Sequence, residues 1–293
     1  MTDKARIKFR PTASSPMIVA TDGREQSDAA VRAGALLADT RDSWRVVTVA
    51  SPFPIMAPEL DLQITAEAVS AHRDAQVGAA RGQVRRILGE VDAHVDALDG
   101  DPADVIARAA AETNASLIVA GLGRHNIIDR VFSGETVLRL VRSASTPVLA
   151  IGPEFVIPRT VVVGLDFSEN SVHAAQLALC FVGHGATVYL MNVAPRPDLL
   201  VMVAGGPAIY HEHAMARMSE FITRFEIPAG VHVQPVVRQG DAAAQILEYA
   251  AATQAGMIAV GTRGQGLIAR MLIGSVATKI IRGSPIAVLT LPS

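Results

Sequence analysis

Cysteine, aromatic residues and charge are all scarce in this sequence. Its 293 residues include one cysteine, Cys180, so an intrachain disulfide and a thiolate cluster for zinc or iron–sulfur are both excluded. Aromatic residues make up 4% of the chain and charged residues 18%, whereas half of the residues are apolar. Such a composition, rich in alanine, valine, isoleucine and leucine, is typical of helices packed over buried parallel strands.

Long apolar runs and a strong charge of either sign are also missing. The formal net charge is −2 and like charges do not gather, which disfavours a nucleic-acid partner. No window approaches the roughly 18 apolar residues that a membrane-spanning helix needs. The first 15 residues are basic but lack the apolar core of a signal peptide. We therefore expect a cytoplasmic protein that binds neither nucleic acid nor membranes, with a loose N-terminal arm.

Short apolar runs alternate regularly with stretches of helical periodicity along the whole chain. The first half predicts strands at 17–21, 45–50, 94–98, 116–121 and 147–151, and helices near 26–38, 60–91, 103–113 and 134–142. The second half predicts strands at 160–165, 187–193, 231–237, 257–261 and 286–291, and helices that start near 168, 209, 242 and 274. The order of elements is the same in both halves.

The spacing of four landmarks supports an internal repeat. Asp22 and Asp166 each follow the first strand of their half and are 144 residues apart. Three pairs of glycines are each 140 residues apart, namely Gly100 with Gly240, Gly121 with Gly261, and Gly134 with Gly274. Such agreement is not expected by chance. It predicts two domains, at 14–152 and 158–293, joined by a linker that prolines bracket.

The alternation of strands and helices indicates an α/β fold. Right-handed connections between parallel strands give two tandem doubly wound domains, each a five-stranded parallel sheet with helices on both faces. Ligands of such sheets bind outside the carboxyl ends of the strands, where the strand order reverses. We therefore expect one crevice in each half, lined by residues that follow strands: Asp22, Val49, Gly100 and Gly121 in the first, and Asp166, Val193, Gly240 and Gly261 in the second.

The segment from Gly261 to Ser275 has the strongest local pattern. Gly261 and Gly264 are followed, after nine intervening residues, by Gly274 and Ser275 at the predicted start of a helix. Glycines let backbone amides approach an anion closely, and a helix start adds free N–H donors and a positive dipole. The pattern therefore predicts a phosphate cradle, in which Ser275 either caps the helix or binds a phosphate.

This glycine pattern, together with Asp166 and the Gly240 turn, resembles the universal stress protein family in its tandem two-domain form. The resemblance extends from about Met17 to Leu291. It implies a site for ATP with a divalent metal, Mg²⁺, on the phosphates, either in a slow ATPase or in a nucleotide-gated regulator of the stress response. It also implies that the strands at 147–151 and 286–291 pair across a pseudo-two-fold axis within the chain, while a homodimer remains possible.

The resemblance assigns roles to individual residues of the second half. It implies that Asp166 and the backbone at Val193 lie near the adenine and ribose, and that Gly240 borders the base pocket. It also implies that the ribose and phosphates are surrounded by Gly261, Arg263, Gly264, Gly274, Ser275 and Val276. Two alternatives remain open, because Asp166 also suits an ordinary helix-opening turn and Arg263 a solvated loop cation.

The first half departs from the pattern at two positions. Arg124 stands where the second glycine belongs, and Glu135 follows Gly134 where the second half has a serine. A carboxylate at a helix start occupies the position that a phosphate needs, and like charges repel. We therefore expect a weak or vacant first site, made of Asp22, Val49, Gly100, Gly121 and Gly134.

Other classes of protein fit less well. The loops after the first strand of each half read ATDGREQS and GLDFSENS, without the Gly-x-Gly-x-x-Gly of dinucleotide-binding enzymes, and the chain has neither a P-loop nor a Gly-x-Ser-x-Gly elbow. No catalytic residue and no metal site of the protein's own is predicted. An ATP-binding regulator is favoured over a slow ATPase and over a scaffold without nucleotide.

Overall fold

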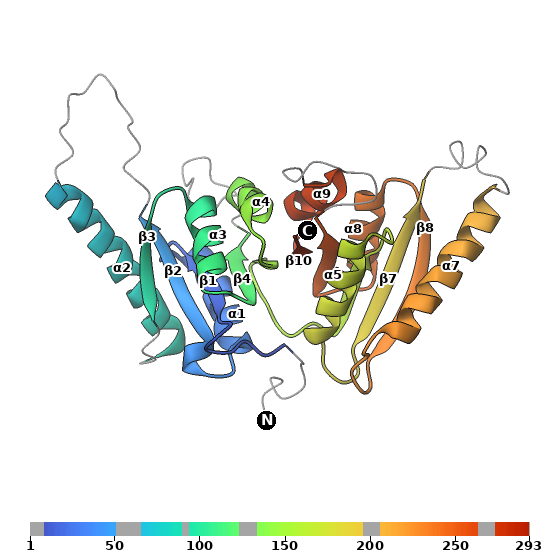
Figure 1. Cartoon of the computed structure of the whole chain (residues 1–293), viewed down its shortest axis with the longest axis horizontal. Coiled ribbons are helices and arrows are strands. Elements are labelled where there is room, and N and C mark those ends of the chain that lie inside the picture. Colours follow the sequence, from blue (N-terminus) through green and yellow to red (C-terminus); the bar gives the residue numbers. More distant parts are fainter. Residues whose placement is uncertain are drawn as a thin grey trace, which may run out of the picture. The chain divides into compact units, whose positions relative to one another are not determined.

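The computed structural model describes residues 9–50, 66–89, 94–122, 134–195, 206–262 and 273–292. The chain divides into two compact units. The first domain runs from Arg10 to Pro153, and the second comprises the chain from Glu154 onward together with Phe9. Both units are α/β domains with five strands in the described residues (Figure 1).

In its described residues, the first domain contains nine main elements. They are β1 (Met17–Thr21), α1 (Asp28–Leu37), β2 (Trp44–Ala50), α2 (Ala66–Leu88), β3 (Val95–Asp99), α3 (Pro102–Glu112), β4 (Leu117–Gly121), α4 (Gly134–Ser143) and β5 (Val148–Ile151). The strands are parallel and lie in the order β3-β2-β1-β4-β5. The residues of β1, β4 and β5 are all buried, as expected for strands covered on both faces.

The second domain repeats this arrangement. Its elements are β6 (Thr160–Gly164), α5 (Glu169–Cys180), β7 (Thr187–Ala194), α7 (Gly206–Arg224), β8 (His232–Gln239), α8 (Ala242–Ala252), β9 (Met257–Gly261), α9 (Ser275–Gly283) and β10 (Ala287–Leu291). The parallel strands lie in the order β10-β9-β6-β7-β8. The predicted doubly wound fold is thus confirmed in both halves, and each predicted strand is present within two residues of its expected bounds.

The direction in which the chain crosses the sheet decides which face each helix covers. In the first domain the chain moves outward from β1 to β2 and β3 and then returns to β4 and β5. Right-handed crossovers therefore place α1 and α2 on one face, and α3 and α4 on the other. The packing agrees, because α1 contacts α2, α3 contacts α4, and in the second domain α8 contacts α9.

Two glycines of the repeat are required by backbone conformation. Gly100 follows β3 with φ 133°, and Gly240 follows β8 with φ 127°. L-residues with a Cβ rarely adopt this region. Each glycine leads directly into an aspartate that caps the next helix, Asp101 at α3 and Asp241 at α8. The pair is therefore explained by the turn from strand to helix.

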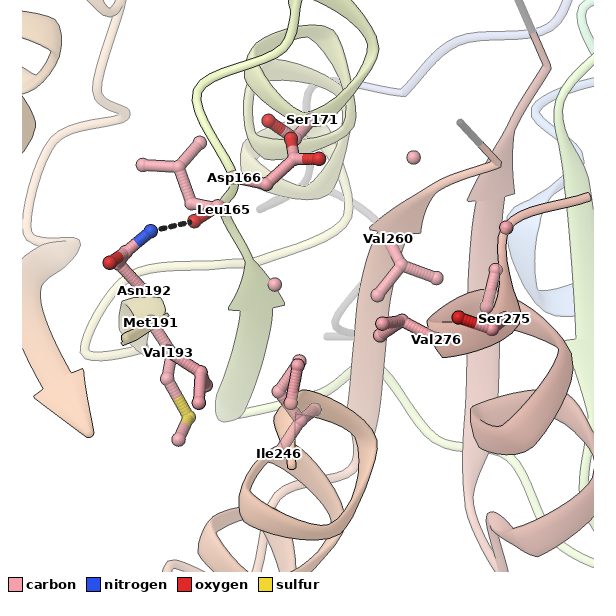
Figure 2. A pocket seen from close by; sticks show the side chains of 15 residues that line it. Leu165, Asp166, Ser171, Met191, Asn192, Val193, Ile246, Val260, Ser275 and Val276 are labelled. Atoms are coloured by element: carbon pink, nitrogen blue, oxygen red, sulfur yellow. Dashed lines mark hydrogen bonds between the residues drawn. The ribbon is translucent and has the colours of Figure 1, made fainter. Parts of the chain in front are cut away.

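The strand order reverses beside the first strand of each domain. β1 lies between β2 and β4, and β6 lies between β7 and β9, so the connections leave the sheet in opposite directions at this point. Figure 2 shows this end of the second domain, with Asp166 after β6, Val260 in β9 and Ser275 at the start of α9. The fold thus brings the carboxyl ends of separate strands together around one opening.

The N-terminal arm is not loose where the structure describes it. Phe9 is buried, its N–H donates to the carbonyl oxygen of Cys180 at 2.9 Å, and its ring stacks on Phe181 at 4.7 Å between centroids. Arg10 forms an ion pair with Asp39. The expectation of a loose arm is therefore wrong for these residues, because an aromatic residue within a basic stretch supplies apolar surface to bury. The residues before Phe9 lie outside the described part.

Among the described helices, none combines the length and the apolar composition that crossing a bilayer requires.

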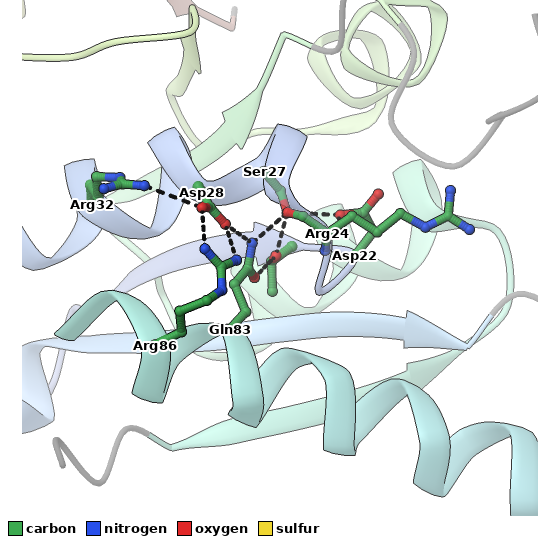
Figure 3. A network of polar contacts seen from close by, with 8 residues as sticks. Asp22, Arg24, Ser27, Asp28, Arg32, Gln83 and Arg86 are labelled. Atoms are coloured by element: carbon green, nitrogen blue, oxygen red, sulfur yellow. Dashed lines mark hydrogen bonds and ion pairs between the residues drawn. The ribbon is translucent and has the colours of Figure 1, made fainter. Parts of the chain in front are cut away.

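A buried polar network holds the β1–α1 turn of the first domain against α2 (Figure 3). Gln83 of α2 is 2% exposed, and its amide nitrogen lies 2.6 Å from the carbonyl oxygen of Arg24 and 2.8 Å from a carboxyl oxygen of Asp28. Its amide oxygen accepts a hydrogen bond from Thr21 at the end of β1. A buried side-chain amide whose nitrogen and oxygen are both hydrogen-bonded fixes the positions of the groups around it.

Asp28 is the charged centre of this network. Arg86 of α2 approaches its carboxylate with both terminal nitrogens at 2.8 Å, and Arg32 lies one helical turn away at 3.2 Å. Burial alone would raise the pKa of Asp28. The hydrogen bonds from Arg86 and Gln83 and the charges of the two arginines outweigh it, so the pKa lies below its ordinary value.

Replacing Asp28 by asparagine is expected to lower the stability of the first domain at pH 7 by roughly 1–2 kcal/mol, because a charge-assisted pair with a half-exposed arginine is lost. A carboxyl with a lowered folded pKa contributes stability above its unfolded pKa of about 3.9 and loses it as pH falls through the folded value. In urea unfolding followed by circular dichroism, the difference in stability between wild type and Asp28→Asn should therefore shrink as the pH falls below about 4.

The exposed carboxyl of Asp74, also in the first domain, supplies the matched control. Asp74→Asn should leave both the stability and its pH dependence unchanged. A gap for Asp28→Asn that stays constant between pH 7 and pH 3 would contradict the assignment of the network to an ionised Asp28.

Candidate functional site

A cavity of about 190 Å³ lies at the carboxyl ends of β6, β7 and β9. Its walls come from five places in the second domain, as Figure 2 shows. The end of β6 and the start of α5 contribute Gly164, Leu165, Asp166 and Ser171; β7 contributes Met191, Asn192 and Val193; α8 contributes Ala242 and Ile246; β9 contributes Val260 and Gly261; and the start of α9 contributes Gly274 through Ala277. The cavity is mostly apolar, with a few polar groups at its rim.

Most of the described residues that the sequence singled out in the second half meet at this cavity. Asp166, Val193, Gly261, Gly274, Ser275 and Val276 all line it. Gly240 does not line it, because it lies in the turn that leads to Ala242. Arg263 and Gly264 lie outside the described residues.

Gly261, at the end of β9, lies very close to the start of α5. A Cβ built on Gly261 would lie 3.0 Å from the backbone carbonyl carbon of Asn170 and 3.0 Å from the amide nitrogen of Ser171. Real Cβ atoms rarely come so close to backbone, so any other residue would push the end of β9 away from the start of α5. In the first domain Gly121 is less confined, with its nearest neighbour, the carbonyl oxygen of Gln26, at 3.4 Å.

The start of α9 faces the cavity. Gly274 is the N-cap, and no side chain of the described residues caps this end, whereas Asp101, Ser168 and Asp241 cap α3, α5 and α8. Ser275 is thus the first residue of the helix, and the capping role considered for it is wrong. The first turn of α9 contains no acidic residue. Its N–H groups and the helix dipole favour an anion.

Asp166 forms part of a turn and also has an exposed carboxylate. Its Oδ1 accepts hydrogen bonds from the N–H and the hydroxyl of Ser168, at 3.0 and 2.6 Å. Ser168 in turn caps α5 through the N–H of Ser171. Asp166 therefore does form the helix-opening turn that was one alternative for it. Because the residue is also exposed and lines the cavity, its carboxylate remains able to accept hydrogen bonds from a ligand.

Phe167 follows Asp166 in a strained backbone conformation. Its φ is 65°, which costs an L-residue roughly 1–2 kcal/mol. The guanidinium carbon of Arg217 lies 4.2 Å from the centre of its ring, and the ring of Phe221 stacks at 6.1 Å. Cation–π and aromatic contacts contribute about 0.5–1.5 kcal/mol each, so together they offset a strain of this size.

Asn192 joins the cavity wall to α7 and was not singled out from the sequence. Its amide nitrogen donates to the carbonyl oxygen of Leu165 at 2.8 Å, and its amide oxygen accepts from the hydroxyl of Tyr210 at 3.0 Å. Burial raises the pKa of Tyr210, against the opposing effects of Asn192 and the charge of Arg217. Its position beside Val193, at the end of a predicted strand, could have indicated that Asn192 lies at the site. A single asparagine in an apolar strand, however, matches no motif of a binding site.

An ion pair joins the start of α8 to α9. Lys279 lies 2.7 Å from Asp241, and this hydrogen bond, with the backbone donors of the cap, lowers the pKa of Asp241. The first domain has the same pair 140 positions earlier, where Arg139 lies 2.8 Å from Asp101. Both pairs are largely exposed. They therefore add little to stability, and their main effect is to hold the two helices of each pair in position.

The corresponding region of the first domain differs in its polar groups. Asp22 is only 9% exposed, and its Oδ1 accepts from the N–H of Arg24 and from the hydroxyl of Ser27. Val49 is buried in β2. Helix α4 begins at Gly134 and carries Glu135 in its first turn. Arg124 lies outside the described residues. The groups that are exposed in the second domain are thus buried or acidic in the first.

The described residues contain no group of three or more histidine, cysteine, aspartate or glutamate side chains arranged to hold a metal ion. Asp166 is the one carboxylate among the residues that line the cavity.

The comparisons with known proteins agree with one another. The model of the universal stress protein family matches residues 14–152 and 158–292. A universal stress protein of Thermus aquaticus is 30% identical over 138 residues, which span 45% of this chain and 96% of that protein. One from Methanocaldococcus jannaschii is 27% identical over 138 residues, 45% of this chain and 80% of that protein.

Solved structures resemble the whole chain. A universal stress protein from Archaeoglobus fulgidus has a TM-score of 0.65 at 19% identity, over 95% of this chain and 96% of that one. A protein from Pseudomonas aeruginosa described as a putative universal stress protein has a TM-score of 0.59 at 17% identity, over 94% and 92%. At these identities the structures support the fold, and the two family matches cover nearly the whole sequence. The chain therefore belongs to the universal stress protein family, two domains of which it carries in tandem.

Proposed function

We propose that the second domain binds ATP and that the protein acts as a nucleotide-dependent regulator of the stress response. The observation that carries the proposal is that the start of α9, which no described side chain caps, lines the same cavity as the exposed carboxylate of Asp166. N–H donors that favour an anion and a carboxylate that accepts hydrogen bonds, in the wall of one apolar cavity, suit a nucleotide, which has phosphates at one end and donor groups at the other.

Each part of the cavity suits one part of ATP. The apolar side chains of Met191, Val193 and Ile246 suit the faces of a purine, and the backbone at Val193 suits its polar edge. Asp166 accepts from ribose hydroxyls or from the base. Gly261 and the first turn of α9 suit the phosphates, and the family resemblance implies that Arg263 and Gly264 lie near them as well.

Mg²⁺ would accompany the phosphates of the nucleotide. Magnesium commonly keeps several waters and binds through one or two carboxylates together with substrate phosphates. Among the described residues, the wall has Asp166 as its one carboxylate, which fits such a mode. Bound there, the ion would neutralise phosphate charge.

The polar side chains of the cavity wall favour a regulatory role over dedicated catalysis. The polar side chains of the cavity wall are Asp166, Ser171, Asn192 and Ser275. The Oδ1 of Asp166 is engaged by Ser168, and the amide of Asn192 by Leu165 and Tyr210. None of these groups is positioned as an evident general base for water. We infer that bound ATP sets the conformation of the domain.

Exchanging the residues at the two helix starts tests the position of the phosphates. Ser275→Glu puts into α9 the carboxylate that α4 carries, and two unit charges about 4 Å apart repel by roughly 4 kcal/mol at an effective dielectric constant of about 20. By isothermal titration calorimetry with ATP and magnesium, affinity should fall by about a hundredfold or more. The reciprocal variant Glu135→Ser is the control, and should leave the tight site intact.

Wild-type protein should bind one ATP tightly per chain in this titration. Absence of binding would overturn the proposed function, and an unchanged affinity in Ser275→Glu would overturn the position of the phosphates. Two equivalent tight sites per chain would contradict the assignment of the principal site to the second domain.

Measurement of phosphate release separates a regulator from an ATPase. We expect purified protein with ATP and magnesium to show no sustained turnover above the background of the Gly264→Arg variant, in which an arginine replaces the second loop glycine. Sustained hydrolysis that Gly264→Arg abolishes would favour the enzyme.

A further inference from the structure

We propose that Arg217 and Phe221 of α7 are positioning residues of the nucleotide site, which hold the turn 166–168 so that the carboxylate of Asp166 stays at the cavity. This inference rests on the proposed function, since it concerns how the same site is kept ready for its ligand. Neither residue lines the cavity.

The first observation is the backbone strain at Phe167. Among the described residues, three that are not glycine have a positive φ: Asn114, Phe167 and Gln254. Asn114 and Gln254 follow the ends of α3 and α8, where a left-handed residue commonly ends a helix. Phe167 instead precedes a helix, is bulky, and lies between two residues that hydrogen-bond to each other. Such strain persists only where surrounding contacts impose it.

The second observation is the source of those contacts. Arg217 and Phe221 are four residues apart on α7, so they lie on the same face of the helix. The guanidinium of Arg217 lies over the ring of Phe167 at 4.2 Å, and the ring of Phe221 is nearly parallel to it, at 21°. Both contacts are made by the ring of the strained residue itself. They therefore select the conformation in which the ring meets α7.

The first domain provides an internal comparison. At the position that corresponds to Phe167 it has Gly23, with φ 78°, so the same left-handed turn forms there without strain. A side chain is excluded, because a Cβ on Gly23 would lie 2.8 Å from that of Ala79 in α2. Gln83 and Arg86 hold that turn through hydrogen bonds instead. An outer helix supports the turn in both domains, but only in the second does the turn contain a strained residue, Phe167, whose own ring makes the supporting contacts.

The conformation of Phe167 determines where the carboxylate of Asp166 lies. The Oδ1 of Asp166 is tied to Ser168 across Phe167, so a change of φ at Phe167 breaks this geometry and moves the carboxylate. If the turn relaxes in a fraction of the molecules, the apparent affinity for nucleotide falls by that fraction. Arg217 and Phe221 thus act on the ligand through Phe167, without touching the ligand.

Four variants test the proposal by calorimetric titration of ATP with magnesium. Arg217→Ala should weaken binding about three- to tenfold. Phe167→Gly, which copies Gly23 of the first domain, should bind nearly as wild type because glycine adopts the turn without support. The double variant Arg217→Ala, Phe167→Gly should recover to within about twofold of wild type. Arg224→Ala, which removes an exposed ion pair of α7 with Glu220, is the matched control and should change nothing.

The outcomes separate this proposal from other roles of the same residues. Unchanged affinity in Arg217→Ala overturns it, as does a double variant that binds no better than Arg217→Ala. A loss in Phe167→Gly equal to that in Arg217→Ala also overturns it, since the ring or the cation would then act on the ligand directly.

A second readout keeps the proposal independent of nucleotide binding. Hydrogen exchange at the amides of Ser168 and Ser171 in the ligand-free protein should accelerate in Arg217→Ala and return to the wild-type rate in the double variant. If wild-type protein binds no ATP, the proposed function fails while this measurement still tests the turn. Unchanged exchange in Arg217→Ala would contradict the positioning role.

Discussion

The close approach of two backbones at Gly261 is the constraint on which the site depends. The end of β9 lies so near the start of α5 that a Cβ on Gly261 would be 3.0 Å from the backbone of Asn170 and Ser171. This contact exists because the strand order reverses between β6 and β9, so that one connection leaves the sheet on each face. It brings the Asp166 turn and the start of α9 to the same cavity, and neither feature alone would make a nucleotide site.

The two domains hold the equivalent turn by different physical means. In the first, Gln83 and Asp28 form a buried polar network with a satisfied charge, and Asp22 is buried with it. In the second, the turn carries strain at Phe167 that contacts with α7 offset, and Asp166 is exposed. A fully hydrogen-bonded network favours rigidity, whereas strain balanced by surface contacts leaves a turn that a neighbouring helix can influence. The turn of the first domain is thus fixed by hydrogen bonds, whereas the turn of the second depends on contacts with α7.

Much of the fold could be predicted from the sequence, because apolar periodicity and glycines that start or end elements are local signals. The strands and the equivalence of Gly100 with Gly240 follow from such signals, and positive φ at both glycines explains the pair. The features that could not be predicted depend on contacts between distant segments. Gln83 reads as an ordinary residue of an exposed helix, and Phe167 as an ordinary residue of a turn. Ser275 was assigned two roles, and the structure excludes capping because the backbone of Gly274 occupies the cap position.

The central claim is that one ATP binds in the second domain with its phosphates at the start of α9. A crystal structure of the full chain grown with magnesium and a non-hydrolysable ATP analogue tests it most directly. The account predicts one analogue per chain, with phosphate oxygens within hydrogen-bond distance of the N–H groups of Ser275 and Val276 and a donor of the nucleoside on Asp166. An analogue bound at the corresponding end of the first domain alone, or one whose phosphates point away from α9, would contradict it.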